Sequence, residues 1–174
     1  MRPQPRLIVR NLLPLMLVAS LVAYGQDTAF VAPHQVKKEL GLLAGYNKEI
    51  GAEDGGPIHM AELGVVRGKY GGRHPIATAT HASVQFGLHD DRPVLAPRVG
   101  AWAALLFSVG AELAYYTDFN EGALVLSPGF GLFAYPLNIA IKPNIHLIGG
   151  DFRPAGGGTL SITYRLVSFK RVRS

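Results

Sequence analysis

His81 and Ser83 are two residues apart in a stretch where apolar and polar residues alternate, so their side chains share one face of a strand. Hydrolases use a serine beside a histidine to attack an ester, with a carboxylate that orients the imidazole. Glu112 is the strand carboxylate that could take this role. We favour the other interpretation, a hydrogen-bonded pair in the interior, and expect no catalytic residue.

Metal and phosphate chemistry find little support in the spacing of the remaining polar residues. The six histidines show no ligand pair such as H-x-x-x-H, and without cysteine the chain has neither thiolate sites nor disulfides. The loop acids Asp90, Asp91, Asp118 and Glu121 lack an EF-hand pattern, and glycines 156–158 lack the context of a phosphate loop. We therefore expect no metal and no cofactor.

Five charged residues lie near the middle of alternating segments, each on the side opposite the aliphatic residues: Glu62, Arg98, Glu112, Lys142 and Arg165. Charges that face water need not balance, whereas enclosed charges must be paired because an unpaired one is costly. Two acids and three bases nearly balance. The set predicts an ion network inside a closed lumen, to which His81 and Gln85 would add hydrogen bonds.

Eight alternating segments follow one another along the chain, at about residues 37–48, 58–67, 75–89, 94–104, 106–118, 124–132, 136–147 and 159–169. Their number is even, and each is close to the ~9–11 residues with which a tilted strand crosses a bilayer. The polar sides are rich in glycine, which suits the crowded inside of an eight-stranded barrel. The pattern predicts an all-β, eight-stranded antiparallel up-and-down transmembrane β-barrel at residues 37–169, with a soluble secreted β-sandwich or ligand-binding barrel as the alternative.

The first 25 residues predict a signal peptide rather than a membrane anchor. Arg2, Arg6 and Arg10 form a basic leader, and a short apolar run follows from residue 12 to residue 23. The small residues Ala23 and Gly25 are typical of the site where a signal peptidase cuts. That run is shorter than the ~20 residues of a spanning helix. Residues 26–36 form a lead-in to the barrel, and residues 170–174 a basic tail.

Removing the leader changes the charge balance. Of the 17 Lys and Arg residues three lie in the leader, and all 12 Asp and Glu residues lie beyond it, which leaves a net charge of +2. So small an excess gives little support for nucleic-acid binding. The mature chain is expected to be exported and to bind no nucleic acid.

The segment "GAELAYYTDF", the following "LSPGFGLF" and the closing "LSITYRLVSF" resemble small uncharacterised outer-membrane β-barrel proteins of Gram-negative bacteria. The resemblance covers residues 37–169 and implies a place in the outer membrane, insertion by the barrel assembly machinery, and contact with outer-membrane lipids and lipopolysaccharide. It implies no reaction. The chain departs from the pattern by continuing past Phe169.

The expected role is therefore structural or one of interaction within the envelope, with a plugged lumen and with a larger envelope complex as a possible partner. A membrane-embedded esterase acting on lipid A is the alternative, because the pair His81 and Ser83 is similar to that of outer-membrane lipid A 3-O-deacylases. The Asn that follows the serine in that family is Val84 here, and its acid is Leu95.

Overall fold

The computed structural model describes residues 36–51, 58–71, 76–90, 92–150, 152 and 154–173, with the backbone alone for 170–173. The predicted signal peptide at 1–25 and the predicted lead-in up to residue 35 lie outside the described residues. The described part is all β, and nothing in it is an apolar helix long enough to cross a membrane.

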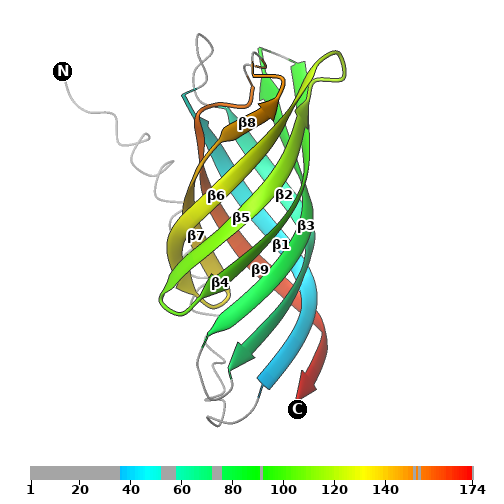
Figure 1. The fold of residues 1–174 in the computed structure, drawn as a ribbon. Coiled ribbons are helices and arrows are strands. Elements are labelled where there is room, and N and C mark those ends of the chain that lie inside the picture. The colour runs from blue at the N-terminus through cyan, green and yellow to red at the C-terminus, as the bar shows by residue number, and fades with distance from the viewer. Residues whose placement is uncertain are drawn as a thin grey trace, which may run out of the picture. The chain divides into compact units, whose positions relative to one another are not determined.

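The described chain forms nine strands that run up and down in sequence order (Figure 1). They are β1 Val36–Ile50, β2 His59–Gly71, β3 Ala77–His89, β4 Arg92–Ala104, β5 Phe107–Thr117, β6 Gly122–Ala134, β7 Leu137–Pro143, β8 Ile145–Ile148 and β9 Gly158–Arg173.

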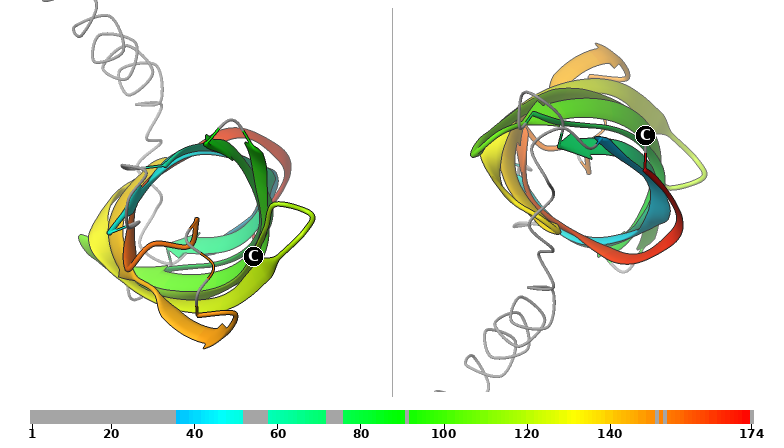
Figure 2. Two further views of the ribbon diagram at one scale, coloured as in Figure 1. Left: turned by 90° about the horizontal axis from the view of Figure 1, so that it is seen from above. Right: turned by 90° about the horizontal axis from the view of Figure 1, so that it is seen from below.

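Eight of these strands close into an antiparallel barrel, because β5 pairs with both β4 and β6 while β9 joins β7 to β1. Seen along its axis, the barrel is a ring of strands (Figure 2). The ninth strand, β8, pairs only with β6 at one end. The eight-stranded antiparallel up-and-down barrel predicted from the sequence is confirmed.

The pairing register fixes the tilt of the strands. One row of paired residues starts at Lys38 on β1, passes once around the barrel through Val109 on β5, and returns to β1 at Lys48, ten residues further on. A stagger of ten residues over eight strands corresponds to a tilt of about 40° from the axis. Each residue along a strand then rises by about 2.5 Å, and each step to the next strand along the row by about 3 Å.

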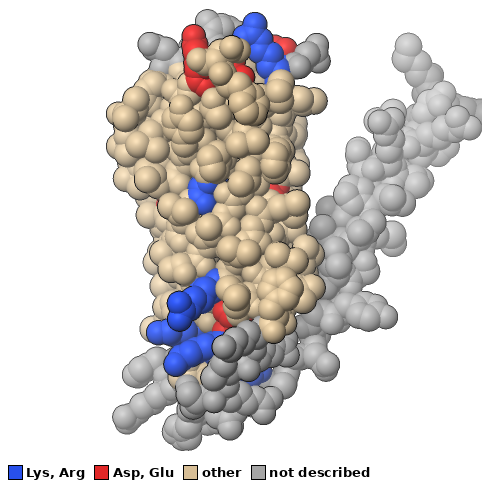
Figure 3. Space-filling view, turned by 90° about the vertical axis from the view of Figure 1, so that its right-hand side faces the viewer, with Lys and Arg blue, Asp and Glu red and all other residues tan. Residues whose placement is uncertain are grey.

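Alternation along the strands separates the lumen from the outer wall. The five predicted charged residues all lie in the lumen and are buried, Glu62 at 2 % and Arg98 at 4 % exposure. Aliphatic residues of the opposite parity cover the outer wall, with Leu63 60 % and Val99 55 % exposed. In Figure 3, uncharged surface forms a broad band between two charged ends, broken only by small spots of blue and red.

The predicted seventh segment is divided into β7 and β8 at Asn144. Pro128 on β6 and Pro143 on β7 both lack an N–H group, so the ladder between these strands stops at Ile141 and resumes at Ile145. The Ser127 hydroxyl donates to Asn144 Oδ1 at 2.7 Å across this gap. The ladder between β7 and β9 ends at Pro143. β8 therefore pairs with β6 on one side and has no strand on the other.

β9 carries a β-bulge that changes which side its residues face. Leu43 pairs with Arg165 but Leu42 pairs with Val167, so Leu166 is an extra residue between them. The alternation predicts Val167 on the polar side, yet Val167 is 51 % exposed on the outer wall. β9 also continues through residues 170–173, where the sequence predicts a tail.

The two ends of the barrel differ. The upper end of the barrel is the one with residues 118–121 and 154–157, and the lower end is the one with the two-residue turns 105–106 and 135–136. β1 begins and β9 ends at the lower end (Figure 1). At the upper end Phe152 and Ala155 belong to a buried apolar cluster with Met60 and Val125.

Candidate functional site

Glu112 on β5 is the centre of a buried ion cluster in the lumen. Its Oε2 lies 2.8 Å from Arg98 Nη1, and its Oε1 lies 2.6 Å from Lys142 Nζ and 3.4 Å from His81 Nε2. The four side chains come from β3, β4, β5 and β7, so the cluster bridges the lumen. A carboxylate that faces two cations is the arrangement that enclosure requires.

Gly100 makes the space for this cluster. A Cβ built at Gly100 would lie 2.6 Å from Glu112 Cγ and 2.7 Å from His81 Cε1, closer than real Cβ contacts allow. The small residues of the lumen therefore accommodate the long charged ones, as the sequence pattern indicates.

Glu62 on β2 is bound by neutral donors. Its Oε1 accepts a hydrogen bond of 2.5 Å from the Ser83 hydroxyl, and its Oε2 accepts one of 2.7 Å from Asn47 Nδ2. The sequence predicts Glu62 within the ion network. The structure places it beside the network, and the partners it gives this carboxylate are a serine and an asparagine.

Arg165 lies in a separate cluster near the lower end. Its Nη1 is 2.9 Å from Glu39 Oε2, which also accepts a 2.9 Å hydrogen bond from the Tyr135 hydroxyl. Arg165 also bonds to the Tyr70 hydroxyl, and its guanidinium lies 4.6 Å from the centre of the Tyr70 ring. The predicted pairing of Arg165 with Glu62 and Glu112 is replaced by one with Glu39, which shares the lumen parity but was not among the predicted residues.

Glu49 is a further lumen carboxylate, one that the sequence places in a loop. It belongs to β1 and is fully buried near the upper end. Its oxygens accept hydrogen bonds of 2.9 Å from the Tyr116 hydroxyl, 2.9 Å from the Thr159 hydroxyl and 3.0 Å from Asn144 Nδ2. Glu49 is two residues after Asn47, so the alternation could have placed it on the same lumen face. The Gly and Pro residues that follow indicated a loop instead.

Ser83 and His81 share a face, as predicted, but bind different carboxylates. The Ser83 hydroxyl donates to Glu62, while His81 Nε2 lies beside Glu112. The contact between His81 and Glu112 is the one that a hydrolase needs; within the described residues no bond joins Ser83 to His81. A histidine activates a serine by accepting the proton of its hydroxyl. The Ser83 hydroxyl donates its proton to Glu62 instead, so His81 does not activate it.

Gln85, predicted as a lumen hydrogen-bonding residue, is fully buried on β3. Among the described residues neither its Oε1 nor its Nε2 has a hydrogen-bond partner, and the same holds for Asn47 Oδ1 and Arg98 Nε. A void of about 20 Å³ borders Glu112 and Lys142, which is room for about one water molecule.

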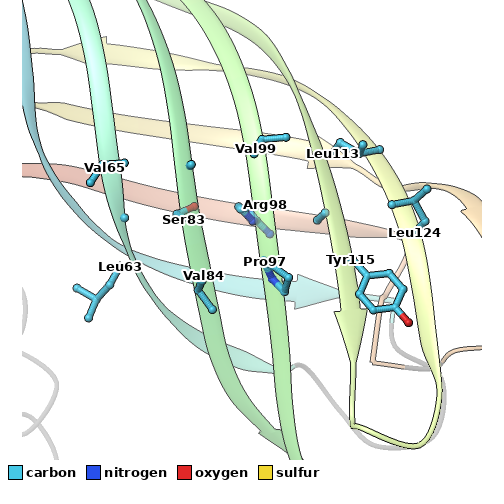
Figure 4. A pocket seen from close by; sticks show the side chains of 13 residues that line it. Leu63, Val65, Ser83, Val84, Pro97, Arg98, Val99, Leu113, Tyr115 and Leu124 are labelled. Carbon is cyan, nitrogen blue, oxygen red and sulfur yellow. The ribbon is translucent and has the colours of Figure 1, made fainter.

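The outer wall carries a shallow hollow of about 540 Å³ whose lining includes Gly64 and Ala82, and Figure 4 shows the larger side chains around it. Leu63, Val84 and Leu113 are among the side chains that line it. Its lining is almost entirely apolar, so it offers no group for chemistry. In the described residues no group of histidines and acids is arranged to hold a metal ion.

Comparison with known proteins assigns no family: no family model matches the chain, and no curated protein matches it.

Proposed function

We propose that this chain is an outer-membrane barrel of Gram-negative bacteria with a plugged lumen and a structural or envelope-interacting role, without catalysis. Its proposed surroundings are outer-membrane lipids and lipopolysaccharide, reached through a signal peptide and the barrel assembly machinery. A larger envelope complex is a further proposed partner.

The observation that carries the proposal is the inverted arrangement of polar and apolar residues. Leu63, Ile76 and Val99 are more than half exposed on the wall, whereas charged side chains are sealed inside. A barrel in water has no reason to expose so much apolar surface. In a bilayer the same wall is solvated by hydrocarbon, and closure gives each of the eight strands of the ring a partner on both sides. Among the described strands β8, at the upper end, is the one that keeps a free edge.

The height of the apolar wall supports a membrane location. Lys38 and Lys48 are outward-facing residues of β1, and the outward residues between them, such as Leu42 and Tyr46, are apolar or aromatic. Ten residues at a tilt of about 40° span roughly 25 Å along the axis. Outer-membrane barrels carry an apolar band of about 25 Å.

A role as a pore is disfavoured by the contents of the lumen. A buried apolar cluster joins Phe152 to residues of β2, β4, β5 and β6 near the upper end, and the ion cluster of Glu112, Arg98 and Lys142 bridges strands further down. An eight-stranded barrel has an interior just wide enough to be filled by side chains.

Insertion into vesicles of phosphatidylcholine tests the membrane proposal. The refolded protein should float with the vesicles and should migrate differently on a gel before and after boiling. Val109→Arg, placed halfway along the row from Lys38 to Lys48, should weaken insertion by about 2–4 kcal/mol, and Leu88→Arg at the upper end by at most about 1. If the wild type stays in the buffer, or if both variants insert equally well, the proposal is wrong.

The esterase alternative has its own test. Lipid A from cells with and without the protein should show the same acyl chains by mass spectrometry. A lost acyl chain that is restored by Ser83→Ala would establish the enzyme and refute a non-catalytic role.

A further inference from the structure

Three cations stand on the outer wall near the lower end, the only place where the described apolar wall carries more than one charge. Lys38 on β1 pairs directly with Lys69 on β2, which pairs with Thr78 on β3. In the next row up, Arg67 pairs with Thr80. All five side chains are exposed, and Figure 3 shows Lys and Arg side chains gathered at this end.

The cations oppose one another, and no described residue places an acid between them. Residues that pair directly across antiparallel strands have Cβ atoms only ~4.5–5.5 Å apart, and like charges in such a pair are destabilising. Among the described strand residues on the outer wall none is acidic, and no ion pair joins Lys38, Lys69 or Arg67 to the described part of the chain. Such a pair is stabilised when an anion lies between the two ammonium groups.

The height of Arg67 indicates where such an anion would lie. Its Cα is about 8 Å above that of Lys38 along the axis, two residues up and one strand over. This places Arg67 inside the apolar band, where a guanidinium must extend toward the membrane surface. Extended downward, its guanidinium would reach the level of Lys69, which would bring the three cations together beside the hydroxyl of Thr78.

We infer that Lys38, Lys69 and Arg67, together with Thr78 and Thr80, bind the phosphate of an anionic glycerophospholipid on the leaflet at the lower end of the barrel. The guanidinium offers paired N–H donors that fit phosphate oxygens, and the ammonium groups and hydroxyls complete the shell. Leu40 and Ala101, neighbours of Arg67 and Thr80 in the same row, would contact the start of the acyl chains. The inference rests on the proposed membrane location and adds to it the class of lipid and its site.

Lipid retention measures the site directly. The protein in a neutral detergent is titrated with phosphatidylglycerol, and bound lipids are counted by native mass spectrometry. Each removed cation should weaken retention about fivefold, and the triple variant Lys38→Gln, Arg67→Gln, Lys69→Gln about 100-fold, given the contribution of each Lys or Arg near an anionic lipid surface. Lys48→Gln, at the other end of the same strand, is the matched control and should retain the lipid. Equal retention by the wild type and the triple variant overturns the inference.

Two further arms identify the ligand and keep the test independent of folding. Soluble glycerol phosphate should not displace the lipid at equal concentration; displacement would show a site for a free anion instead. In neutral detergent, Lys69→Gln should be at least as stable as the wild type. Once phosphatidylglycerol is added, it should be less stable than the wild type in the same lipid. A variant that is less stable than the wild type in both media would refute the site.

The proposed function and this inference can fail separately. If the wild type does not enter phosphatidylcholine vesicles, the membrane location is wrong and the lipid site falls with it. If the wild type and the triple variant both enter, but retain phosphatidylglycerol equally, only the lipid site is wrong.

Discussion

Replacing Glu112 by glutamine removes one charge from the lumen and keeps the shape of the side chain. Glu112 is the carboxylate that both Arg98 and Lys142 approach, at 2.8 Å and 2.6 Å. The variant therefore leaves two cations facing a neutral amide in a closed space. Neither cation can turn to solvent, because both side chains are almost fully buried.

The expected loss of stability follows from these distances. At an effective dielectric constant of about 20, each of the two pairs is worth roughly 6 kcal/mol of attraction, most of which offsets the cost of removing the charges from water. Breaking a buried pair by removing one partner costs about 3–5 kcal/mol. Because Glu112 serves two cations, we expect the free energy of unfolding to fall by a value near the upper end of that range.

Trp102 provides the assay, since it is the only tryptophan of the chain. It packs in the lumen, where the centre of its ring lies 4.9 Å from the centre of the Phe133 ring. Its fluorescence should report guanidinium unfolding of the protein in detergent micelles. Glu121→Gln, in an exposed position between β5 and β6, is the matched control and should change stability by less than about 0.5 kcal/mol.

A second substitution separates a charge effect from a packing effect. Lys142→Met on the Glu112→Gln background removes one of the unpaired cations, so the double variant should be more stable than Glu112→Gln alone. If Glu112→Gln loses less than about 1 kcal/mol, or if the double variant is the less stable of the two, the lumen charges do not hold the barrel together in this way.

Three other predictions concern single positions. Gln85→Met should raise stability by about 1–2 kcal/mol, because it removes a buried amide without partners; a loss in the same unfolding assay would contradict this. Phe152→Ala should lower stability by about 3 kcal/mol yet leave planar bilayers without conductance, since the Glu112 cluster still crosses the lumen; measurable channels would refute the plugged lumen. The pKa of the Asp118 carboxyl should be lower than usual, because the backbone amides of Glu121 and Asn120 donate to it. The contribution of this carboxyl to stability is therefore present above its pKa in the unfolded chain and is lost as the pH falls through its lower pKa in the folded chain. A titration of the Asp118 carboxyl by NMR would detect the lowered pKa.

The alternation of residue types was sufficient to predict the barrel and the face of each predicted charge. Glu62, Arg98 and Lys142 all lie in the lumen because a period of two leaves only two sides for a strand residue. The same rule fails at Val167. The extra residue of the β9 bulge, Leu166, comes just before it, so Val167 faces the outer wall instead of the lumen. A bulge has no fixed sequence signature, so only the pairing reveals it.

Which lumen residues meet depends on their height along the axis, and height depends on the register between strands. The sequence predicts a face for Arg165 but not its distance from Glu39, which is 126 residues away in the chain and adjacent in space. Glu49 was assigned to a loop for a related reason: local composition indicated the end of a strand, whereas pairing with β9 extends β1 to Ile50.

Once the row of paired residues that starts at Lys38 is known, the height of any residue follows from counting strands along the row and residues away from it. Taking Lys38 as zero, with about 2.5 Å for each residue and about 3 Å for each strand, four lumen charges fall at roughly 20–22 Å: Glu62, Arg98, Glu112 and Lys142. Arg165 falls at about 9 Å, which explains its separation from the others and its pairing with a carboxylate near the lower end. A shift of two residues between β4 and β5 would preserve every side assignment but move Glu112 about 5 Å along the axis from Arg98. The buried ion pair and the two-residue turn at 105–106 therefore select the same register, which alternation alone leaves undetermined.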